Sequence, residues 1–321
     1  YLHGELPKAW KSFQSYKGGT IIAFLDSVMN NVLYRDVYDR LSLHVEIGLN
    51  AETVLQSYAP EELLDCDAFL CVDRILVKWL VERLLSEDIG AKLDQLSIPD
   101  ICEKRMKMHF GRKTGAAYQV IRSAYVLATA ANYQCPDDFK GIIDQYQEKD
   151  WMIDQEYRKF YTAFDVMENG DGFDGLRNMV ENIYTNRVLA VQLPKWNGAI
   201  HEEEAFLTLP LQRNFYNRYI KNSKERTVVI ISDAMRYEVG RQLFLQMQDN
   251  PKCTAKMEAM LGILPSYTRL GMAALLPHSS LSMKDDYTVL ADERNCDNLA
   301  DRQTILQMYQ PDALCLQFDD I

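Results

Sequence analysis

The sequence predicts an α/β protein in which a helical region, residues 1–221, precedes the truncated beginning of a doubly wound core, residues 222–321. Two observations indicate this fold class. Apolar residues before about residue 220 recur at helical spacing, and the run 227–231 is continuously β-branched and leads into a carboxylate and a helical pattern. With 321 residues, 47% hydrophobic and 25% charged, the chain has an ordinary globular balance for two domains.

Helical periodicity dominates the first region. Apolar side chains follow one helical face in four segments, which are represented by Phe69, Val72, Leu76, Trp79, Leu80 and Leu84; Tyr118, Ile121, Tyr125 and Ala128; Tyr157, Phe160, Tyr161 and Phe164; and Leu176, Met179, Val180 and Ile183. Breaks are expected at 97–99, at 135–136 and at the turn cluster 169–172. A sub-boundary is expected near 136–150, and we predict almost no strand in this region.

The pattern changes after Asn222. The run 227–231 suits a strand buried on both faces of a parallel sheet, with Asp233 at its carboxyl end and a helix over 237–247. Residues 255–264 are expected to form a second strand and 314–318 a further one. Between them, 265–268 predicts a turn, and a short helix is expected from Arg269 to Leu276, closed by Pro277.

Charge and cysteine content exclude some classes of function. The formal net charge is −11, so the chain does not coat DNA non-specifically, because that requires many Lys and Arg side chains. The seven cysteines form no CxxC pair and no Cys/His cluster, which favours reduced thiols in a cytoplasmic protein. No apolar run is long enough to cross a bilayer. Because the sequence starts at Tyr1 and stops after a strand-like run, we expect it to be a piece of a longer protein.

Asp233 and Thr268 carry the chemistry that the sequence offers. A carboxylate at the end of a strand is a rigid oxygen ligand, suited to Zn²⁺, Mg²⁺ or Mn²⁺. A hydroxyl is a weak nucleophile that needs a base or a metal to activate it. Each residue alone is more often a helix cap, and a strand, an Asp and a helix also follow one another in response regulators and dehalogenases. Gly271, one helical turn after Thr268, would let a substrate or a metal-bearing loop approach.

Two long motifs resemble one family. The stretches VVIISDAMRYEVGRQL (228–243) and AMLGILPSYTRLGMAALLPH (259–278) closely resemble the PglZ family, type A, of BREX phage-defence systems. Upstream segments are similar to the same family, so the resemblance covers most of the chain. They are FLCVDRILVKWLVERLL (69–85), DQEYRKFYTAFD (154–165), VENIYTN (180–186) and LPLQRNFYNRYI (209–220).

The resemblance implies an alkaline-phosphatase-like core with a two-metal site. In that superfamily the acid after the first strand binds metal, which corresponds to Asp233 here. A Ser or Thr in the proline-led turn is the nucleophile and a second-metal ligand, which corresponds to Thr268, with Ser266 as the nearest competing hydroxyl. The expected cofactors are divalent metal ions, Zn²⁺ above all. The superfamily completes both sites with Asp and His residues much later in the chain, including an Asp-His pair that this sequence lacks; after Thr268 its only histidine is His278.

The resemblance therefore implies a metal-dependent phosphate-ester hydrolase, a phosphatase or phosphodiesterase, within a BREX anti-phage system. The alternative is a non-catalytic scaffold that binds other BREX components through the helical region and the phosphatase-like core. The expected partners are other BREX proteins and a phosphate-ester substrate, with nucleic acid as one candidate, and no membrane. Because its metal ligands are incomplete, the 321-residue chain alone is expected to be inactive.

Several other residues invite a function and have a simpler interpretation. His278 is expected to be a helix-terminal or a surface histidine and not a metal ligand. Arg236 and Arg269 flank the two site residues and could face phosphate oxygens, or be solvated. The basic run 104–113 could contact DNA or an acidic partner, but an exposed helix face is the expected interpretation. Residues 202–204 are an acidic loop by the same reasoning.

Overall fold

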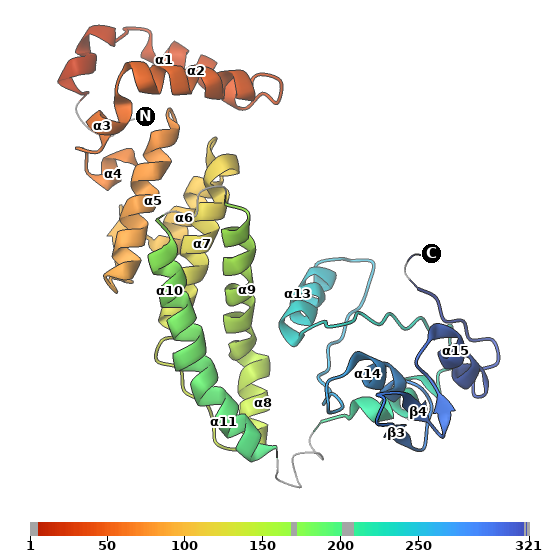
Figure 1. Ribbon diagram of the computed structural model, residues 1–321. Helices are drawn as coiled ribbons and strands as arrows, with labels where there is room; N and C mark the ends of the chain where they lie inside the picture. Colours follow the sequence, from red (N-terminus) through yellow and green to blue (C-terminus); the bar gives the residue numbers. More distant parts are fainter. Residues whose placement is uncertain (1–5, 168–171, 201–208, 318, 320–321) are drawn as a thin grey trace. The chain divides into compact units, whose positions relative to one another are not determined.

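The computed structural model describes residues 6–167, 172–200, 209–317 and 319. The chain forms two compact units (Figure 1). Unit 1 comprises residues 1–135 and 148–194, and unit 2 comprises residues 136–147 and 195–321. The division into domains at residues 221 and 222 stays a prediction. Within the described residues, no helix is both long enough and apolar enough to span a membrane.

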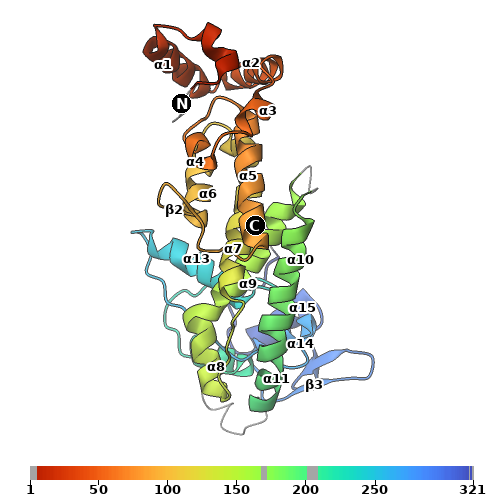
Figure 2. The ribbon, with the colours of Figure 1, turned by 90° about the vertical axis from the view of Figure 1, so that its left-hand side faces the viewer.

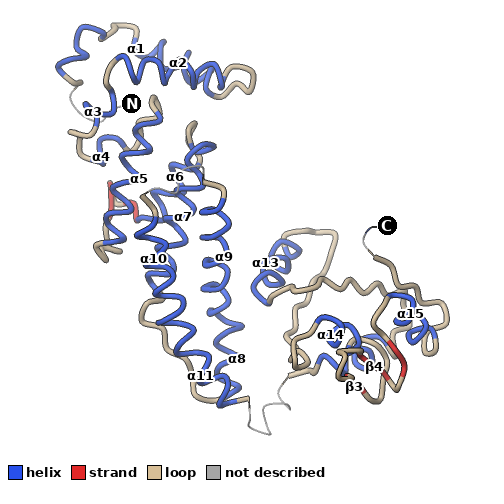
Figure 3. Tube along the Cα trace, viewed as in Figure 1, coloured by secondary structure: helices blue, strands red, loops and turns tan. Residues whose placement is uncertain are grey.

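Unit 1 is built from helices, as Figure 3 shows by colour. Its α-helices are α1 (Gly18–Met29), α2 (Arg35–Gly48), α3 (Ala51–Leu55), α4 (Pro60–Leu63), α5 (Leu70–Leu85), α6 (Ile98–Met106), α7 (Gly111–Thr129), α9 (Trp151–Asp165) and α10 (Asp174–Asn182). A 3₁₀ turn (Lys8–Phe13) precedes α1, and a π-helical turn occurs at Ile183–Leu189; a second π-helical turn, Tyr146–Asp150, spans the division between the units. The strands described in this unit are β1 (Lys92–Leu93) and β2 (Leu96–Ser97), which have two residues each and form an antiparallel hairpin. The prediction of almost no strand is confirmed for the described part of this region.

The core of unit 1 confirms the four helical stripes. About half of the side chains that the pattern placed inside are buried, among them Leu76, Leu80, Tyr118, Ile121, Phe160, Leu176 and Val180, and most of the others, such as Trp79, Tyr157 and Phe164, are half-buried and pack against the same core. Helix α7 packs along both α6 and α9. Each large apolar side chain buried here stabilises the fold by about 1.5–3 kcal/mol relative to exposure.

The expected breaks separate helices where the structure describes them. Ser97 and Asp100 form a capping box at the start of α6, because the Ser97 N–H donates to Asp100 Oδ2 at 3.1 Å, and Pro99 lies in the first turn. Cys135 and Pro136 lie between α7 and α8 (Phe139–Gln145). Most of the cluster 169–172 lies outside the described residues; Gly172 has a φ of +101°.

Helix α2 shows an inverted pattern of burial. It buries Tyr38, Asp39, Ser42 and Glu46, most of which are polar or charged. It exposes large apolar side chains that include the stripe Val37, Leu41 and Val45, at 39%, 60% and 46% exposure. Helices α1 and α2 lie at one end of unit 1 (Figures 1 and 2). An apolar stripe on the open side of a helix is a feature of interaction surfaces.

Unit 2 combines short helices with a small antiparallel sheet. Its α-helices are α8, α13 (Tyr237–Gln248), α14 (Thr268–Ala274) and α15 (Leu299–Gln307), with a 3₁₀ turn at Gln212–Asn214 and a π-helical turn at Tyr216–Ile220. Helix α11 (Ala190–Ala199) spans the division between the units. Strands β3 (Leu281–Met283), β4 (Val289–Ala291) and β5 (Arg294–Asn295) pair in this order, with Ser282 opposite Leu290.

A small core holds the second unit together. It contains Leu270 and Ala273 of α14, Val289 and Ala291 of β4, and Cys296 and Ile305. Two predictions for this region are confirmed, since the helix expected over 237–247 is α13 and the short helix before Pro277 is α14.

The strands predicted at 228–231, 255–264 and 314–318 do not form within the described residues of unit 2. Residues 228–231 belong to no strand and are 44–88% exposed. Residues 255–264 contribute one isolated parallel bridge, from Leu261 to Leu211, and 314–317 form no strand, while 318 lies outside the described residues. A buried parallel strand needs neighbouring strands at its edges and helices over both faces. The described residues of unit 2 provide no parallel sheet around 228–231, so a β-branched run alone cannot form the predicted doubly wound core.

Candidate functional site

Asp233 lies in the loop between the segment 228–231 and helix α13. Its side chain is exposed, and its Oδ1 accepts a hydrogen bond from the N–H of Ala234 at 2.9 Å. Ala234 has a φ of +55°, in the left-handed region. The N-cap of α13 is Arg236, which makes no side-chain capping bond. Asp233 is therefore not a helix cap, and the simpler interpretation of this carboxylate does not hold.

Thr268 is the first residue of α14. Tyr267 is the N-cap, no side chain caps this helix, and Thr268 is exposed. The turn before it contains a cis peptide bond between Leu264 and Pro265, and the Tyr267 N–H donates to the Pro265 carbonyl at 2.7 Å. The hydroxyl of Thr268 is therefore not used as a cap either.

Neighbouring side chains fix the backbone that carries Thr268. Leu270 is 6% exposed and packs in the small core of unit 2, against which Tyr267 also lies. The guanidinium of Arg269 is 3.4 Å from a carboxylate oxygen of Asp297. Thr268 thus stands on an anchored stretch of chain while its own side chain faces outward.

Gln212 joins this stretch from a distant part of the sequence. Its Oε1 accepts from the Ile263 N–H at 3.0 Å, and its Nε2 donates to the Gly271 carbonyl at 3.1 Å. Sequence reasoning missed this residue, because a lone glutamine in a polar segment carries no signal. A Cβ added at Gly271 would lie 3.5 Å from Gln212 Nε2, an ordinary contact, so the Gln212 side chain does not require a glycine there.

Asp233 and Thr268 both belong to unit 2, and among the described residues no hydrogen bond connects them. The described residues contain no group of three or more His, Cys, Asp or Glu side chains that could hold a metal ion. Zinc sites use three or four protein ligands. The two predicted ligands have the right oxygen chemistry, but alone they do not make a complete metal site.

The other tempting residues of unit 2 have local contacts. His278 Nδ1 lies 2.7 Å from the Leu276 carbonyl, as expected for a histidine just after a helix end. Ser266, the competing hydroxyl, is exposed in the turn before α14. The acidic residues 202–204 lie outside the described residues.

The basic run 104–113 is not an exposed helix face, and that expectation is wrong. Arg105 is fully buried, with its Nε donating to Asp73 Oδ1 at 2.9 Å and its Nη1 to the Cys66 carbonyl at 2.8 Å. Lys104 pairs with Asp65, and Lys107 pairs with Glu103. Acidic side chains of the same unit therefore partner these cations, and only the pair of Arg105 with Asp73 is fully buried.

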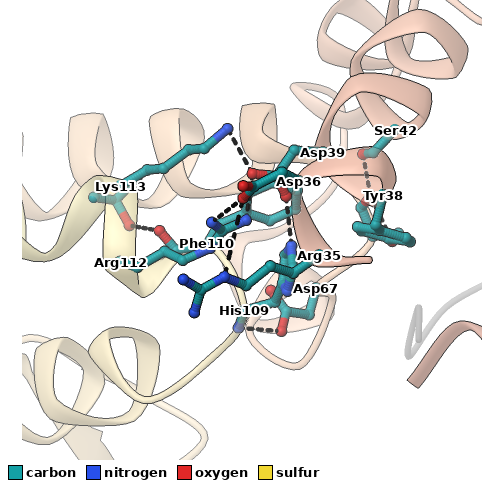
Figure 4. A network of polar contacts seen from close by, with 12 residues as sticks. Arg35, Asp36, Tyr38, Asp39, Ser42, Asp67, His109, Phe110, Arg112 and Lys113 are labelled. Carbon is teal, nitrogen blue, oxygen red and sulfur yellow. Dashed lines mark hydrogen bonds and ion pairs between the residues drawn. The ribbon is translucent and has the colours of Figure 1, made fainter. Parts of the chain in front are cut away.

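The end of this run surrounds one buried carboxylate, as Figure 4 shows. The Asp39 carboxylate of α2 forms ion pairs with Arg112 and with Lys113, the second at 2.7 Å. His109 Nε2 lies 2.6 Å from Oδ1 of Asp39. The N–H of His109 donates to Asp67 Oδ2 at 2.7 Å. These contacts attach α2 to the junction of α6 and α7.

The pKa values of the two carboxylates in this cluster, Asp39 and Asp67, are shifted in opposite directions. Burial raises the pKa of Asp39, but hydrogen bonds from Lys113 and His109 and the charges of Lys113 and Arg112 outweigh burial and leave the pKa below its ordinary value. Burial raises the pKa of Asp67, and the hydrogen bond from the His109 backbone offsets this only in part. An ionised Asp39 only accepts hydrogen bonds, so His109 donates to it.

Comparison with known proteins places both predicted site residues inside a recognised domain. Residues 213–321 match the BREX system PglZ alkaline phosphatase-like domain. The matched range contains Asp233 and Thr268, while Gln212 lies immediately before it. No solved structure matches the chain.

Two curated relatives align with nearly the whole chain. The alkaline phosphatase-like protein PglZ of Bacillus cereus (strain H3081.97) is 33% identical over 334 residues, which cover 100% of this chain and 38% of that protein. The alkaline phosphatase-like protein BrxZ of Escherichia coli O9:H4 (strain HS) is 29% identical over 315 residues, covering 91% of this chain and 36% of that protein. The chain therefore spans less than two fifths of the length of either relative.

Proposed function

Because the chain belongs to the PglZ family of alkaline phosphatase-like proteins, we propose that the full-length protein is a metal-dependent phosphate-ester hydrolase of a BREX anti-phage system. One observation carries the proposal: within the matched domain, Thr268 presents an exposed hydroxyl on an anchored backbone and does not cap its helix. The proposed location is the cytoplasm, and the proposed partners are other BREX proteins.

In the proposed reaction Thr268 is the nucleophile. Its Oγ1 attacks phosphorus in line with the leaving group, a new P–O bond forms, and the ester P–O bond breaks. The leaving alkoxide departs with the electrons of the broken bond and takes up a proton, balancing the one that the Thr268 hydroxyl gives up. Water then attacks phosphorus in the phospho-threonine, releases the phosphate and restores the hydroxyl. Arg236 is the better candidate for holding phosphate oxygens, because the guanidinium of Arg269 is already 3.4 Å from the Asp297 carboxylate.

The proposed cofactor is a divalent metal ion, Zn²⁺ above all, with Asp233 and Thr268 as ligands. The two oxygen groups suit such an ion but do not complete its coordination. The superfamily resemblance assigns the remaining ligands to Asp and His residues much later in the chain, and both relatives are longer than this chain. We propose that other parts of the full-length protein also supply neighbours for the segment 228–231 and complete a doubly wound sheet.

The test compares two hydroxyls in the full-length protein. With Zn²⁺ present, Thr268→Ala should abolish hydrolysis of p-nitrophenyl phosphate and bis(p-nitrophenyl) phosphate, because the nucleophile is gone. Thr268→Ser should retain part of the activity, since the hydroxyl remains. Ser266→Ala is the matched control, an exposed hydroxyl two positions away, and should stay active.

Opposite results would assign the chemistry elsewhere. A dead Ser266→Ala variant beside a fully active Thr268→Ala variant would make Ser266 the nucleophile. Asp233→Ala should lower metal content and activity together. The 321-residue chain alone should bind zinc weakly and show no turnover above its own Thr268→Ala variant, because its ligands are incomplete.

A scaffold is the second candidate function, and helix α2 favours it. Its exposed stripe, Val37, Leu41 and Val45, offers an apolar surface to another BREX component. Cells that keep phage defence with an inactive Thr268→Ala protein, and lose it with Leu41→Asp, would favour the scaffold. Cells that lose defence with Thr268→Ala alone would favour the hydrolase.

A further inference from the structure

The segment that carries Thr268 is held from outside by residues 210–212. The Leu261 N–H donates to the Pro210 carbonyl at 2.8 Å, and the Gln212 N–H donates to the Leu261 carbonyl at 2.9 Å. Leu211 and Leu261 form an isolated parallel bridge. These backbone bonds fix the position of Gln212 beside the start of the segment.

The side chain of Gln212 then holds both ends of the segment. Ile263, whose N–H donates to Gln212 Oε1 at 3.0 Å, precedes Thr268 in the chain. Gly271, whose carbonyl accepts from Gln212 Nε2 at 3.1 Å, follows it within α14. One half-buried amide therefore spans the turn and the first part of the helix, with Thr268 between its two contacts.

Only an amide side chain of this length satisfies both contacts. The Ile263 N–H requires an acceptor, and the Gly271 carbonyl requires a donor, and glutamine supplies one of each. Alanine supplies neither. Glutamate supplies the acceptor but, when ionised, places a second acceptor against the Gly271 carbonyl. The chemistry of the contact is therefore specific to this residue type, which makes it testable.

We infer that Gln212 is a positioning residue that orders residues 262–271 and so sets the direction of the Thr268 hydroxyl. The inference rests on the proposed function, because it gives that order a catalytic purpose. Thr268 has no hydrogen bond of its own that would hold its side chain as a cap. Its direction depends on the backbone, and Gln212 contacts that backbone on both sides.

Hydrogen–deuterium exchange on the full-length protein tests the ordering directly. Gln212→Ala should speed exchange across 262–271 by about tenfold, since the loss of hydrogen bonds to two half-buried backbone groups removes roughly 1.4 kcal/mol of local protection. Gln212→Glu should exchange faster than wild type at pH 7. The difference should shrink as the pH falls towards roughly 4.3, the ordinary carboxyl pKa, because the protonated acid regains a donor.

Gln307→Ala is the matched control. Gln307 is another half-buried glutamine of unit 2, and its amide donates to the Ala313 carbonyl at 2.9 Å, outside the Thr268 segment. It should leave exchange at 262–271 unchanged. Hydrolysis of bis(p-nitrophenyl) phosphate should show kcat lowered about 10- to 100-fold in Gln212→Ala with KM nearly unchanged, because misplacement of a nucleophile weakens chemistry more than binding.

Three results would overturn the inference. Exchange at 262–271 could stay at the wild-type level in a folded Gln212→Ala protein, or the Gln307→Ala control could loosen the segment equally. The segment could also loosen while kcat stays unchanged. If the wild-type protein hydrolyses neither nitrophenyl ester, the proposed function fails, and the exchange measurements still decide whether Gln212 orders the segment.

Discussion

Two polar regions of the molecule differ in how their groups are partnered. In unit 1 the basic run 104–113 meets acidic side chains, among them Asp39 of α2 and Asp73 of α5, and the pair Arg105 and Asp73 is 0% and 1% exposed. In unit 2 Asp233 and Thr268 are exposed, and neither caps a helix. Charged groups that are buried and paired stabilise the fold, whereas exposed side chains that cap no helix leave their oxygens accessible to a ligand. A dense run of charge in the sequence can therefore be a structural feature and not a binding site.

The largest expected effect comes from the buried pair. Arg105→Ala should lower the free energy of unfolding by about 3–5 kcal/mol, because it leaves the Asp73 carboxylate buried without its counter-charge. Urea unfolding followed by tryptophan fluorescence measures this difference. Lys107→Ala, from the same run, is the control: its pair with Glu103 is exposed, so its loss should cost about 0.3–0.5 kcal/mol. Equal losses in the two variants would erase the distinction between paired core cations and surface ones.

The cluster around Asp39 predicts a dependence on pH. Asp39→Asn should lower the free energy of unfolding by about 1.5–3 kcal/mol at pH 7, since Arg112, Lys113 and His109 lose a charged acceptor. A folded-state pKa below the unfolded value of about 3.9 contributes stability above that value, and the contribution disappears as the pH falls through the folded pKa. The difference between wild type and Asp39→Asn should therefore narrow below about pH 4.

An exposed carboxylate serves as the control for that series. Asp36 also binds Arg112, at 2.9 Å, but its side chain is 77% exposed. Asp36→Asn should change the free energy of unfolding by less than about 1 kcal/mol at neutral pH. A difference between wild type and Asp39→Asn that stays constant from pH 7 to pH 3 would contradict the assignment of the pH dependence to Asp39.

The helices were predictable because their pattern is local. The stripes that contain Leu76, Tyr118 and Phe160 repeat within each helix, and the same residues fill the core of unit 1. The acidic partners of the basic run were not predictable from its composition. Asp73 lies 32 positions from Arg105, and Asp39 lies 70 from His109, so only the tertiary fold brings them together.

The strand predictions failed because a strand, unlike a helix, depends on partners that are distant in the sequence. The β-branched run 228–231 satisfies the local preference for a strand, but a strand forms only when partners from elsewhere pair with it. For the candidate site, the sequence located two exposed residues inside the matched domain, and their catalytic roles stay predictions. Gln212 could not be found, since its two partners lie 51 and 59 positions away.

The smallest expected effect separates a functional residue from a helix cap. Thr268→Ala and Asp233→Ala should each change the free energy of unfolding by less than about 0.5 kcal/mol, because both side chains are exposed and neither caps a helix. Asn298→Ala is the matched control: Asn298 caps α15, its side chain accepting from the Asp301 N–H at 2.9 Å, and its loss should cost about 1 kcal/mol. Thermal unfolding of the three variants measures these differences.

A loss of stability for Thr268→Ala as large as that for Asn298→Ala would show that Thr268 stabilises its helix. Lost stability would then explain any loss of hydrolysis equally well. A stable but inactive Thr268→Ala protein leaves chemistry as the explanation.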